Sequence, residues 1–254
     1  MVISKKHLGQ HFLFDKNIAL KIVNSLKNNN KYPVLEIGPG KGILTDYLIK
    51  CFDDLYLIEI DTESVSFLNE KYPENLFNLI NADFLKLDLQ ETLKNNEFCI
   101  IGNLPYNISS QIFFKILDNK KYIPEVVCMI QKEVAERIFS KHGTKSYGIL
   151  SVLIQLFYKT EYLFTVNETV FTPRPKVKSG VIRLERYRNT IPGIDEKELL
   201  GIVKTAFNQR RKVLRNSLKN IIPEDIITEN QAVFKLRPEQ LSPEDFVDLV
   251  RLTK

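Results

Sequence analysis

The tetrapeptide Asn103-Leu104-Pro105-Tyr106 ends an apolar run, residues 98–102, that has the character of a buried strand. Asn103 offers a side-chain carbonyl, and Pro105, which has no N–H, fixes a turn that lets the Leu104 main-chain carbonyl point into a pocket. Two such acceptors would hold both hydrogens of an exocyclic amine and direct its lone pair toward an electrophile. Tyr106 can stack on an extruded base. The tetrapeptide therefore predicts a platform for a base amine; a simple turn with a core tyrosine is the alternative.

A glycine-rich loop, residues 38–42, joins the first apolar strand to the following helix. Glycine permits positive φ and lets a ligand approach the backbone closely. The loop alone is weak evidence, because dinucleotide-binding enzymes use one for a pyrophosphate and tight turns also need glycine. Glu36 makes the signal sharper, since a charged residue inside an apolar strand rarely lacks a role. Gly38 and Gly40 are therefore predicted to border a cofactor.

Two further acidic residues stand at the ends of the next two predicted strands. Glu59 ends the strand "LYLIE" and is suited to accept both hydroxyls of a ribose. Asp83 follows the third strand and is suited to accept from an adenine amino group, although a helix N-cap would look the same. Strand-end acids together with the Asn103 loop match a nucleoside cofactor without phosphates, and S-adenosylmethionine is such a cofactor. The sequence therefore predicts S-adenosylmethionine as the cofactor.

Short apolar runs alternate with amphipathic stretches over the first two thirds of the chain, as in a parallel α/β sheet. The predicted strands are residues 33–38, 55–60, 77–80, 98–103 and 126–131, with closing strands at 158–166 and 179–187. After residue 188 only helical patterns follow, at 194–209, 210–221 and 242–254. We therefore predict an α/β domain over residues 1–188 and a small helical domain over residues 189–254.

Composition restricts the class of protein further. The chain has 254 residues, 44% of them hydrophobic, and its longest apolar run is too short to span a bilayer. Three widely spaced cysteines, Cys51, Cys99 and Cys128, indicate neither a disulfide framework nor a metal site. The chain start lacks the apolar stretch of a secretion signal. We expect a cytoplasmic protein with no membrane association and no bound metal, and a monomer.

Basic residues are concentrated in two clusters, whereas the net charge is only +5. One contains Lys204, Arg210, Arg211, Lys212, Arg215 and Lys219 with no acid among them, and the other contains Arg174, Lys176, Lys178, Arg183, Arg186 and Arg188. A solvated helix face usually alternates the sign of its charges. The clusters favour a polyanionic partner such as nucleic acid, to be bound through its phosphates.

Several motifs in order resemble those of the bacterial 16S (small-subunit) ribosomal RNA adenine N6,N6-dimethyltransferase family. They are "KKHLGQHFL", "EIGPGKGILT", "LIEID", "NADF", "GNLPYNISS", "QKEVAERI", "VFTPRPKVKSGVIRL" and "AFNQRRKVLRNSL", and they extend over nearly the whole chain. The resemblance implies a Rossmann-like class I S-adenosylmethionine-dependent methyltransferase sheet with a small C-terminal all-α domain. It implies that residues 1–188 form the catalytic domain and that residues 189–254 form an RNA-binding domain. It also implies methylation of two adjacent adenosines in the 3′-terminal hairpin of 16S rRNA within the small ribosomal subunit, and a role in ribosome biogenesis.

The resemblance also implies roles for individual residues. The family's cofactor contacts fall on His11, Leu13, Gly38, Glu59, Asp83 and Asn103. His11 departs from the family pattern, because many relatives have asparagine there, so a side-chain bond to the cofactor needs an imidazole nitrogen. Phe171 corresponds to a second aromatic residue that would sandwich the target base against Tyr106, and a core phenylalanine is the alternative.

Other functions stay open at this point. The related enzyme that dimethylates 23S rRNA and confers macrolide resistance shares the Asn-x-Pro-Tyr loop. A DNA adenine methyltransferase usually has an Asp-Pro-Pro-Tyr loop and a larger sequence-reading domain. A small-subunit assembly factor, in which RNA binding matters more than methylation, belongs to another class. A nicotinamide-dependent oxidoreductase is disfavoured, because nothing resembles a hydride-transfer site.

Overall fold

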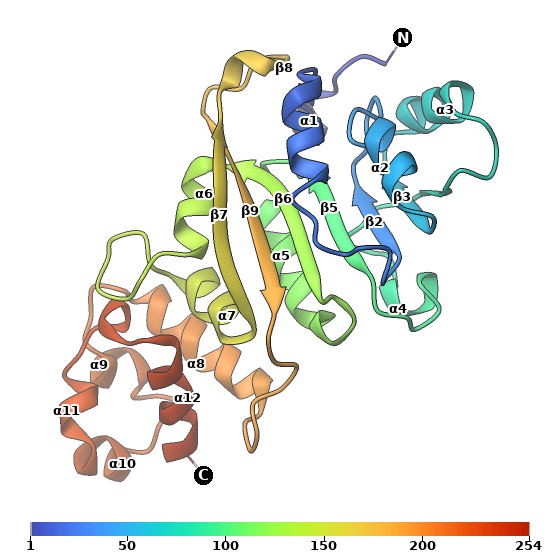
Figure 1. The fold of residues 1–254 in the computed structure, drawn as a ribbon. Helices are drawn as coiled ribbons and strands as arrows, with labels where there is room; N and C mark the ends of the chain where they lie inside the picture. Colours follow the sequence, from blue (N-terminus) through green and yellow to red (C-terminus); the bar gives the residue numbers. More distant parts are fainter. Residues whose placement is uncertain (1, 254) are drawn as a thin grey trace. The chain divides into compact units, whose positions relative to one another are not determined.

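A seven-stranded sheet forms the centre of the larger of two units in the computed structural model, which describes residues 2–253 (Figure 1). The strand order is β4-β3-β2-β5-β6-β9-β7. Their bounds are β2 Val34–Ile37, β3 Leu55–Glu59, β4 Asn78–Asn81, β5 Cys99–Asn103, β6 Glu125–Gln131, β7 Tyr158–Val166 and β9 Ser179–Arg186. Strands β4, β3, β2, β5 and β6 are parallel, whereas β9 pairs antiparallel with β6. The predicted α/β sheet with closing strands is confirmed.

The parallel strands are continuous apolar runs because both of their faces are covered. Every residue of β2 is buried, as are the first six of β6. On one face Val34, Leu57 and Ile101 pack in a core cluster with Ile22 of α1 and Leu48 of α2. Figure 1 shows α1 in front of the sheet and α5 behind it. The helices of this part are η1 Lys6–Leu8, α1 Lys16–Val23, α2 Thr45–Cys51, α3 Thr62–Lys71, α4 Leu89–Thr92, α5 Ser109–Asp118, η2 Lys120–Tyr122, α6 Lys132–Ile138 and η3 Glu168–Val170.

A second, two-stranded sheet ties the N-terminal segment to a distant part of the chain. Strand β1, Phe12–Leu13, pairs antiparallel with β8, Phe171–Thr172. Leu13 and Phe171 lie opposite each other and belong to the same apolar core. The pairing places residues 7–12 beside the carboxyl ends of the central strands, where they line a cavity.

The smaller unit is helical. It comprises Glu136–Lys159 and the chain from Tyr187 onward, so the last three residues of α6 and the first two of β7 belong to it as well. Its helices are α7 Ile149–Phe157, α8 Glu196–Asn208, α9 Leu214–Leu218, α10 Glu224–Glu229, α11 Gln231–Phe234, η4 Pro238–Gln240 and α12 Pro243–Leu252. α8 packs against α7, α9 and α12. No helix among the described residues has the length and apolar character needed to cross a membrane.

Candidate active site

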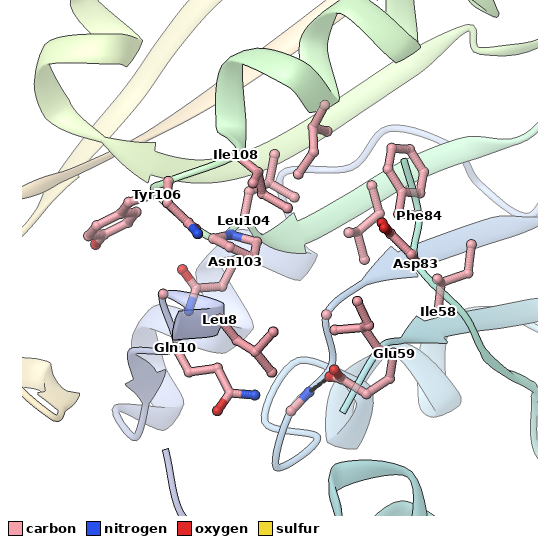
Figure 2. A pocket seen from close by; sticks show the side chains of 18 of the residues that line it. Leu8, Gln10, Ile58, Glu59, Asp83, Phe84, Asn103, Leu104, Tyr106 and Ile108 are labelled. Atoms are coloured by element: carbon pink, nitrogen blue, oxygen red, sulfur yellow. Dashed lines mark hydrogen bonds between the residues drawn. The ribbon is translucent and has the colours of Figure 1, made fainter. Parts of the chain in front are cut away.

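A cavity of about 230 Å³ opens at the carboxyl ends of β2, β3 and β5, where parallel α/β sheets bind their ligands. Figure 2 shows Glu59 and Asp83 toward one side of it and Asn103, Leu104 and Tyr106 toward the other. All of these residues belong to the larger unit. The lining residues include His7, Leu8, Gly9, Gln10, His11, Phe12, Ile37, Gly38, Gly40, Ile58, Glu59, Ile60, Asp83, Phe84, Asn103, Leu104, Pro105, Tyr106 and Ile108.

Two glycines of the glycine-rich loop leave space beside the backbone. The space at Gly38 is open to a ligand, and the space at Gly40 is filled by the Phe12 ring. Gly38 has φ +66°, and a Cβ built there would meet no atom within 4 Å, so its open side faces the cavity. Gly40 has φ +55°, and a Cβ there would lie 2.8 Å from Cε1 of Phe12. Any other residue at Gly40 would be strained and would push the N-terminal segment away. Both glycines line the cavity, and their contact with a cofactor stays a prediction.

Glu59 holds the loop and the next turn together. Its Oε2 accepts from the Gly40 N–H at 3.0 Å, and its Oε1 accepts from the Asp61 N–H at 2.9 Å. The side chain is buried, and burial raises the pKa of Glu59 against these two bonds, which lower it. Each carboxylate oxygen retains a second lone pair, so the group can still accept from a ligand hydroxyl.

Asp83 caps a turn and also lines the cavity. Its Oδ1 accepts from the Leu85 N–H at 2.9 Å, so it caps the turn after β4, and Lys86 Nζ lies 3.9 Å from Oδ2. It also lines the cavity beside Phe84, whose ring is buried. A capping aspartate with one oxygen left for a ligand amine is compatible with a cofactor role.

The Asn103 amide is oriented by the N-terminal segment. Its Nδ2 donates to the main-chain carbonyl of His11 at 2.9 Å, which leaves Oδ1 as the acceptor available to a ligand. Leu104 donates its N–H to the Met129 carbonyl at 3.0 Å, while its own carbonyl accepts no hydrogen bond from the described residues. Pro105 also lines the cavity. The two acceptors predicted from the tetrapeptide thus lie in one loop with free lone pairs.

Tyr106 is held at both its hydroxyl and its ring. The hydroxyl lies 2.6 Å from Oγ of Ser179, the buried first residue of β9. The ring stacks on His11, with centroids 5.4 Å apart and planes at 29°. Burial raises the pKa of Tyr106, while the contact with Ser179 lowers it. A neutral tyrosine fixed in this way is suited to stacking on a base.

Leu13 and Phe171 lie beside the main cavity without lining it. They are 4% and 3% exposed and pack in the core cluster, paired across β1 and β8. Leu13 lines a smaller cavity of about 30 Å³ together with Gly38 and Asn103. The aromatic ring that contacts Tyr106 in this structure belongs to His11, and the sandwiching role of Phe171 stays a prediction.

The apolar wall of the cavity and the ion pair that holds the N-terminal segment were not predicted from the sequence. Leu8, Phe84 and Ile108 line the cavity. Lys5 pairs with Asp61, which sits 3% exposed just after β3, and the nearby Gln10 Nε2 lies 3.4 Å from Oδ2 of Asp61. Lys5 and Gln10 are the only local hint of this contact in the sequence. Their common partner, Asp61, lies about 50 residues further along the chain.

Glu36 is fully buried beside the smaller cavity. Thr45 donates its hydroxyl to Oε2 of Glu36 at 2.6 Å. The pKa of Glu36 is raised to about 8, and burial is the main cause. The nearby carboxylate of Glu59 also raises this pKa, whereas the hydrogen bond from Thr45 lowers it. The side chain therefore carries a proton through most of the neutral range.

Many of the clustered basic residues are neutralised by acids from elsewhere in the chain. Arg174, Arg183, Arg186 and Arg188 pair with Glu168, Glu161, Glu97 and Glu244, and Arg210 and Arg215 pair with Glu239 and Glu224. Among the described residues, no acid forms an ion pair with the exposed Arg211, Lys212 or Lys219, or with Lys176 or Lys178. These five remain available to phosphates.

Comparison with known proteins agrees with this geometry. The model of the family "Ribosomal RNA adenine dimethylase" matches residues 2–253. A protein of Parabacteroides distasonis named ribosomal RNA small subunit methyltransferase A is 52% identical over all of this chain and 95% of its own length. A protein of the same name from Porphyromonas gingivalis is 53% identical over 99% of this chain and 98% of its own.

Solved structures with the same fold include two methyl-transferring enzymes. A dimethyladenosine transferase from Plasmodium falciparum has a TM-score of 0.79 at 26% identity and covers 94% of this chain and 96% of its own. The 23S rRNA methyltransferase ErmE has a TM-score of 0.72 at 25% identity and covers 95% and 99%. The predicted class I methyltransferase fold is thereby confirmed. With its sequence matched from end to end and the Asn-Leu-Pro-Tyr loop set beside the strand-end acids, the chain belongs to the ribosomal RNA adenine dimethylase family.

Proposed function

We propose that this protein transfers methyl groups from S-adenosylmethionine to N6 of two adjacent adenosines in the 3′-terminal hairpin of 16S rRNA. The observation that carries the proposal is the orientation of Asn103, whose Nδ2 is engaged by the His11 carbonyl so that Oδ1 is left to accept from the target amine. The names of the relatives that are 52–53% identical support the small subunit as the source of the RNA.

The cavity fits S-adenosylmethionine. Gly38 leaves an open space where a side chain would otherwise stand, which suits close approach of a ligand. Glu59 and Asp83 offer acceptors to a ribose and to an adenine amine, and their negative charge suits a cationic cofactor. Ile58 and Phe84 supply apolar walls for the adenine ring.

The residues of the chain act by positioning and by electrostatics. When bound, S-adenosylmethionine would supply an electrophilic methyl group to N6 and would leave as S-adenosylhomocysteine, and the methylated amine would release its proton to water. Asn103 Oδ1 and the Leu104 carbonyl would accept the two N–H groups of the amine and favour a pyramidal nitrogen. Tyr106 would stack on the extruded base. No strong base is needed, so orientation accounts for most of the acceleration.

RNA binding is assigned to exposed basic residues. Arg211, Lys212 and Lys219 in the proposed helical domain, residues 189–254, suit contacts with phosphates, which position an RNA without reading its sequence. Shape recognition is the usual mode for structured RNA. We propose a monomer that acts in the cytoplasm on the small subunit.

The decisive experiment supplies labelled S-adenosylmethionine and small ribosomal subunits from a host that lacks this modification, and maps the product by mass spectrometry. Dimethyladenosine at two adjacent positions of the 3′-terminal hairpin is expected. Large subunits from the same host are the control, because the 23S enzyme would label those instead. Label only in large-subunit RNA, or none in either, would contradict the proposal.

A further inference from the structure

His11 contacts both halves of the proposed amine platform. Its main-chain carbonyl accepts from Asn103 Nδ2 at 2.9 Å, and its imidazole stacks on Tyr106 with centroids 5.4 Å apart. The residue also lines the cavity. One residue of the N-terminal segment therefore fixes the direction of the acceptor amide and the position of the stacking ring.

The imidazole is itself held in place. His11 Nδ1 lies 2.7 Å from the main-chain carbonyl of Pro173. A carbonyl can only accept, so Nδ1 donates in this contact and carries a hydrogen. Pro173 follows β8, and β8 pairs with β1, which begins directly after His11. The His11 ring is therefore held by the residue that directly follows β8, the strand that pairs with β1.

The spacing of the His11 and Tyr106 rings shows that His11 occupies one face of Tyr106. Stacked aromatic rings have centroids about 4.5–7 Å apart, and a base inserted between two rings would need roughly two stacking distances, about 7 Å. At 5.4 Å the His11 and Tyr106 rings are already in contact. No base fits between them, so His11 covers one face of Tyr106, and a target base would have to stack on the other.

We propose that His11 is a positioning residue for the target adenosine, acting through Tyr106 and Asn103. The inference rests on the function proposed above and deepens it. It differs from the role that the family resemblance implies for this position, a side-chain bond to the cofactor. It also gives Tyr106 an aromatic neighbour that is distinct from the core residue Phe171.

Three variants separate the two roles. His11→Ala removes the ring, His11→Phe keeps a ring but loses the bond to Pro173, and His11→Asn restores a polar side chain without a ring. At saturating S-adenosylmethionine, we expect His11→Ala and His11→Asn to lower kcat/KM for small subunits about tenfold, as loss of a stacking contribution does. His11→Phe should recover most of this loss. The Kd for S-adenosylmethionine, measured by calorimetry, should change less than about twofold in all three.

The matched control is His142→Ala, since His142 is an exposed histidine outside the site; it should behave as the wild type. Thermal melting of each variant shows that a lost activity is not lost folding. Full activity of His11→Ala would overturn the inference, and so would rescue by His11→Asn without rescue by His11→Phe. A loss confined to cofactor affinity would also overturn it. An inactive wild type would instead refute the proposed function, and this inference with it.

Discussion

The Glu59 carboxylate bridges the glycine-rich loop and the turn after β3, because its two oxygens accept from the N–H groups of Gly40 and Asp61 at 3.0 and 2.9 Å. A glutamine cannot accept at both positions, since one of its two terminal atoms is a donor. The loop and the proposed ribose acceptor therefore depend on the same side chain.

We expect Glu59→Gln to weaken S-adenosylmethionine binding by about 10- to 100-fold, because one N–H is left unpaired and one acceptor is lost. Calorimetric titration with the cofactor measures this change. Asp88→Asn is a suitable control: Asp88 caps α4 and is exposed, away from the cavity. Equal Kd values for Glu59→Gln and the wild type would refute the assignment.

Asn103 is the residue on which methyl transfer should depend most. Asn103→Ala removes the acceptor, and Asn103→Asp keeps oxygens but loses the donor to the His11 carbonyl, so its carboxylate faces that carbonyl unfavourably. We expect kcat to fall about 100- to 1,000-fold in both, by analogy with loss of one transition-state hydrogen bond. Labelled methyl incorporation under saturating substrates gives kcat. An Asn103→Asp protein with wild-type kcat would show that amide orientation is unimportant.

Glu36 makes the stability of the protein depend on pH. Burial raises its pKa to about 8 in the folded protein, above the 4.5 of a free glutamate, so the folded state favours the protonated form. This contribution is complete below about pH 4.5 and is lost as pH rises through about 8. Glu36→Gln, which can still accept from Thr45, should remove that decline, worth up to roughly 5 kcal/mol.

Urea unfolding at pH 6 and at pH 9 checks this expectation. The wild type should lose more free energy of unfolding between these two values than Glu36→Gln does. Glu59 contributes in the same direction, because burial raises its pKa as well, and its effect is common to both proteins. Parallel pH dependences would mean that Glu36 is not protonated in the folded state.

Basic residues without an acid partner should matter more for RNA binding than paired ones. The triple variant Arg211→Ala, Lys212→Ala and Lys219→Ala should bind small subunits about 10- to 100-fold more weakly, and the dependence of binding on salt should become shallower. Arg215→Ala is the paired control, because Arg215 already forms an ion pair with Glu224. Filter binding over a range of salt concentrations measures both quantities. A larger effect of Arg215→Ala would contradict the assignment.

The sequence predicts the sheet well because each of its strands carries its own local signal. Strand β7 has the predicted bounds, and β2, β3, β5, β6 and β9 agree to within one residue at each end. Continuous apolar runs are what buried parallel strands require. In the helical unit, α10 and α11 have no counterpart among the predicted helices, because they are only 6 and 4 residues long.

Site residues can be predicted from the sequence only where they follow a local pattern, such as a polar residue at the end of an apolar strand. Gly38, Glu59, Asp83 and Asn103 line the cavity because they stand at strand ends. By contrast, the pairing of β1 with β8 and the stacking of His11 on Tyr106 join residues far apart in the sequence. The sequence also does not show which basic residues are paired, because the acids that neutralise Arg183 and Arg186 come from other elements.

The wall that His11 and Phe12 contribute to the cavity also constrains the order of folding. The contact from His11 to Pro173 spans 162 residues, and the contact from Tyr106 to Ser179 spans 73. Closing so long a loop carries a large entropic cost, so such contacts form late. During synthesis the first strands can pair well before residue 179 has been made. A nascent chain can therefore build most of its sheet before His11 and Tyr106, which line the cavity, gain their contacts with Pro173 and Ser179.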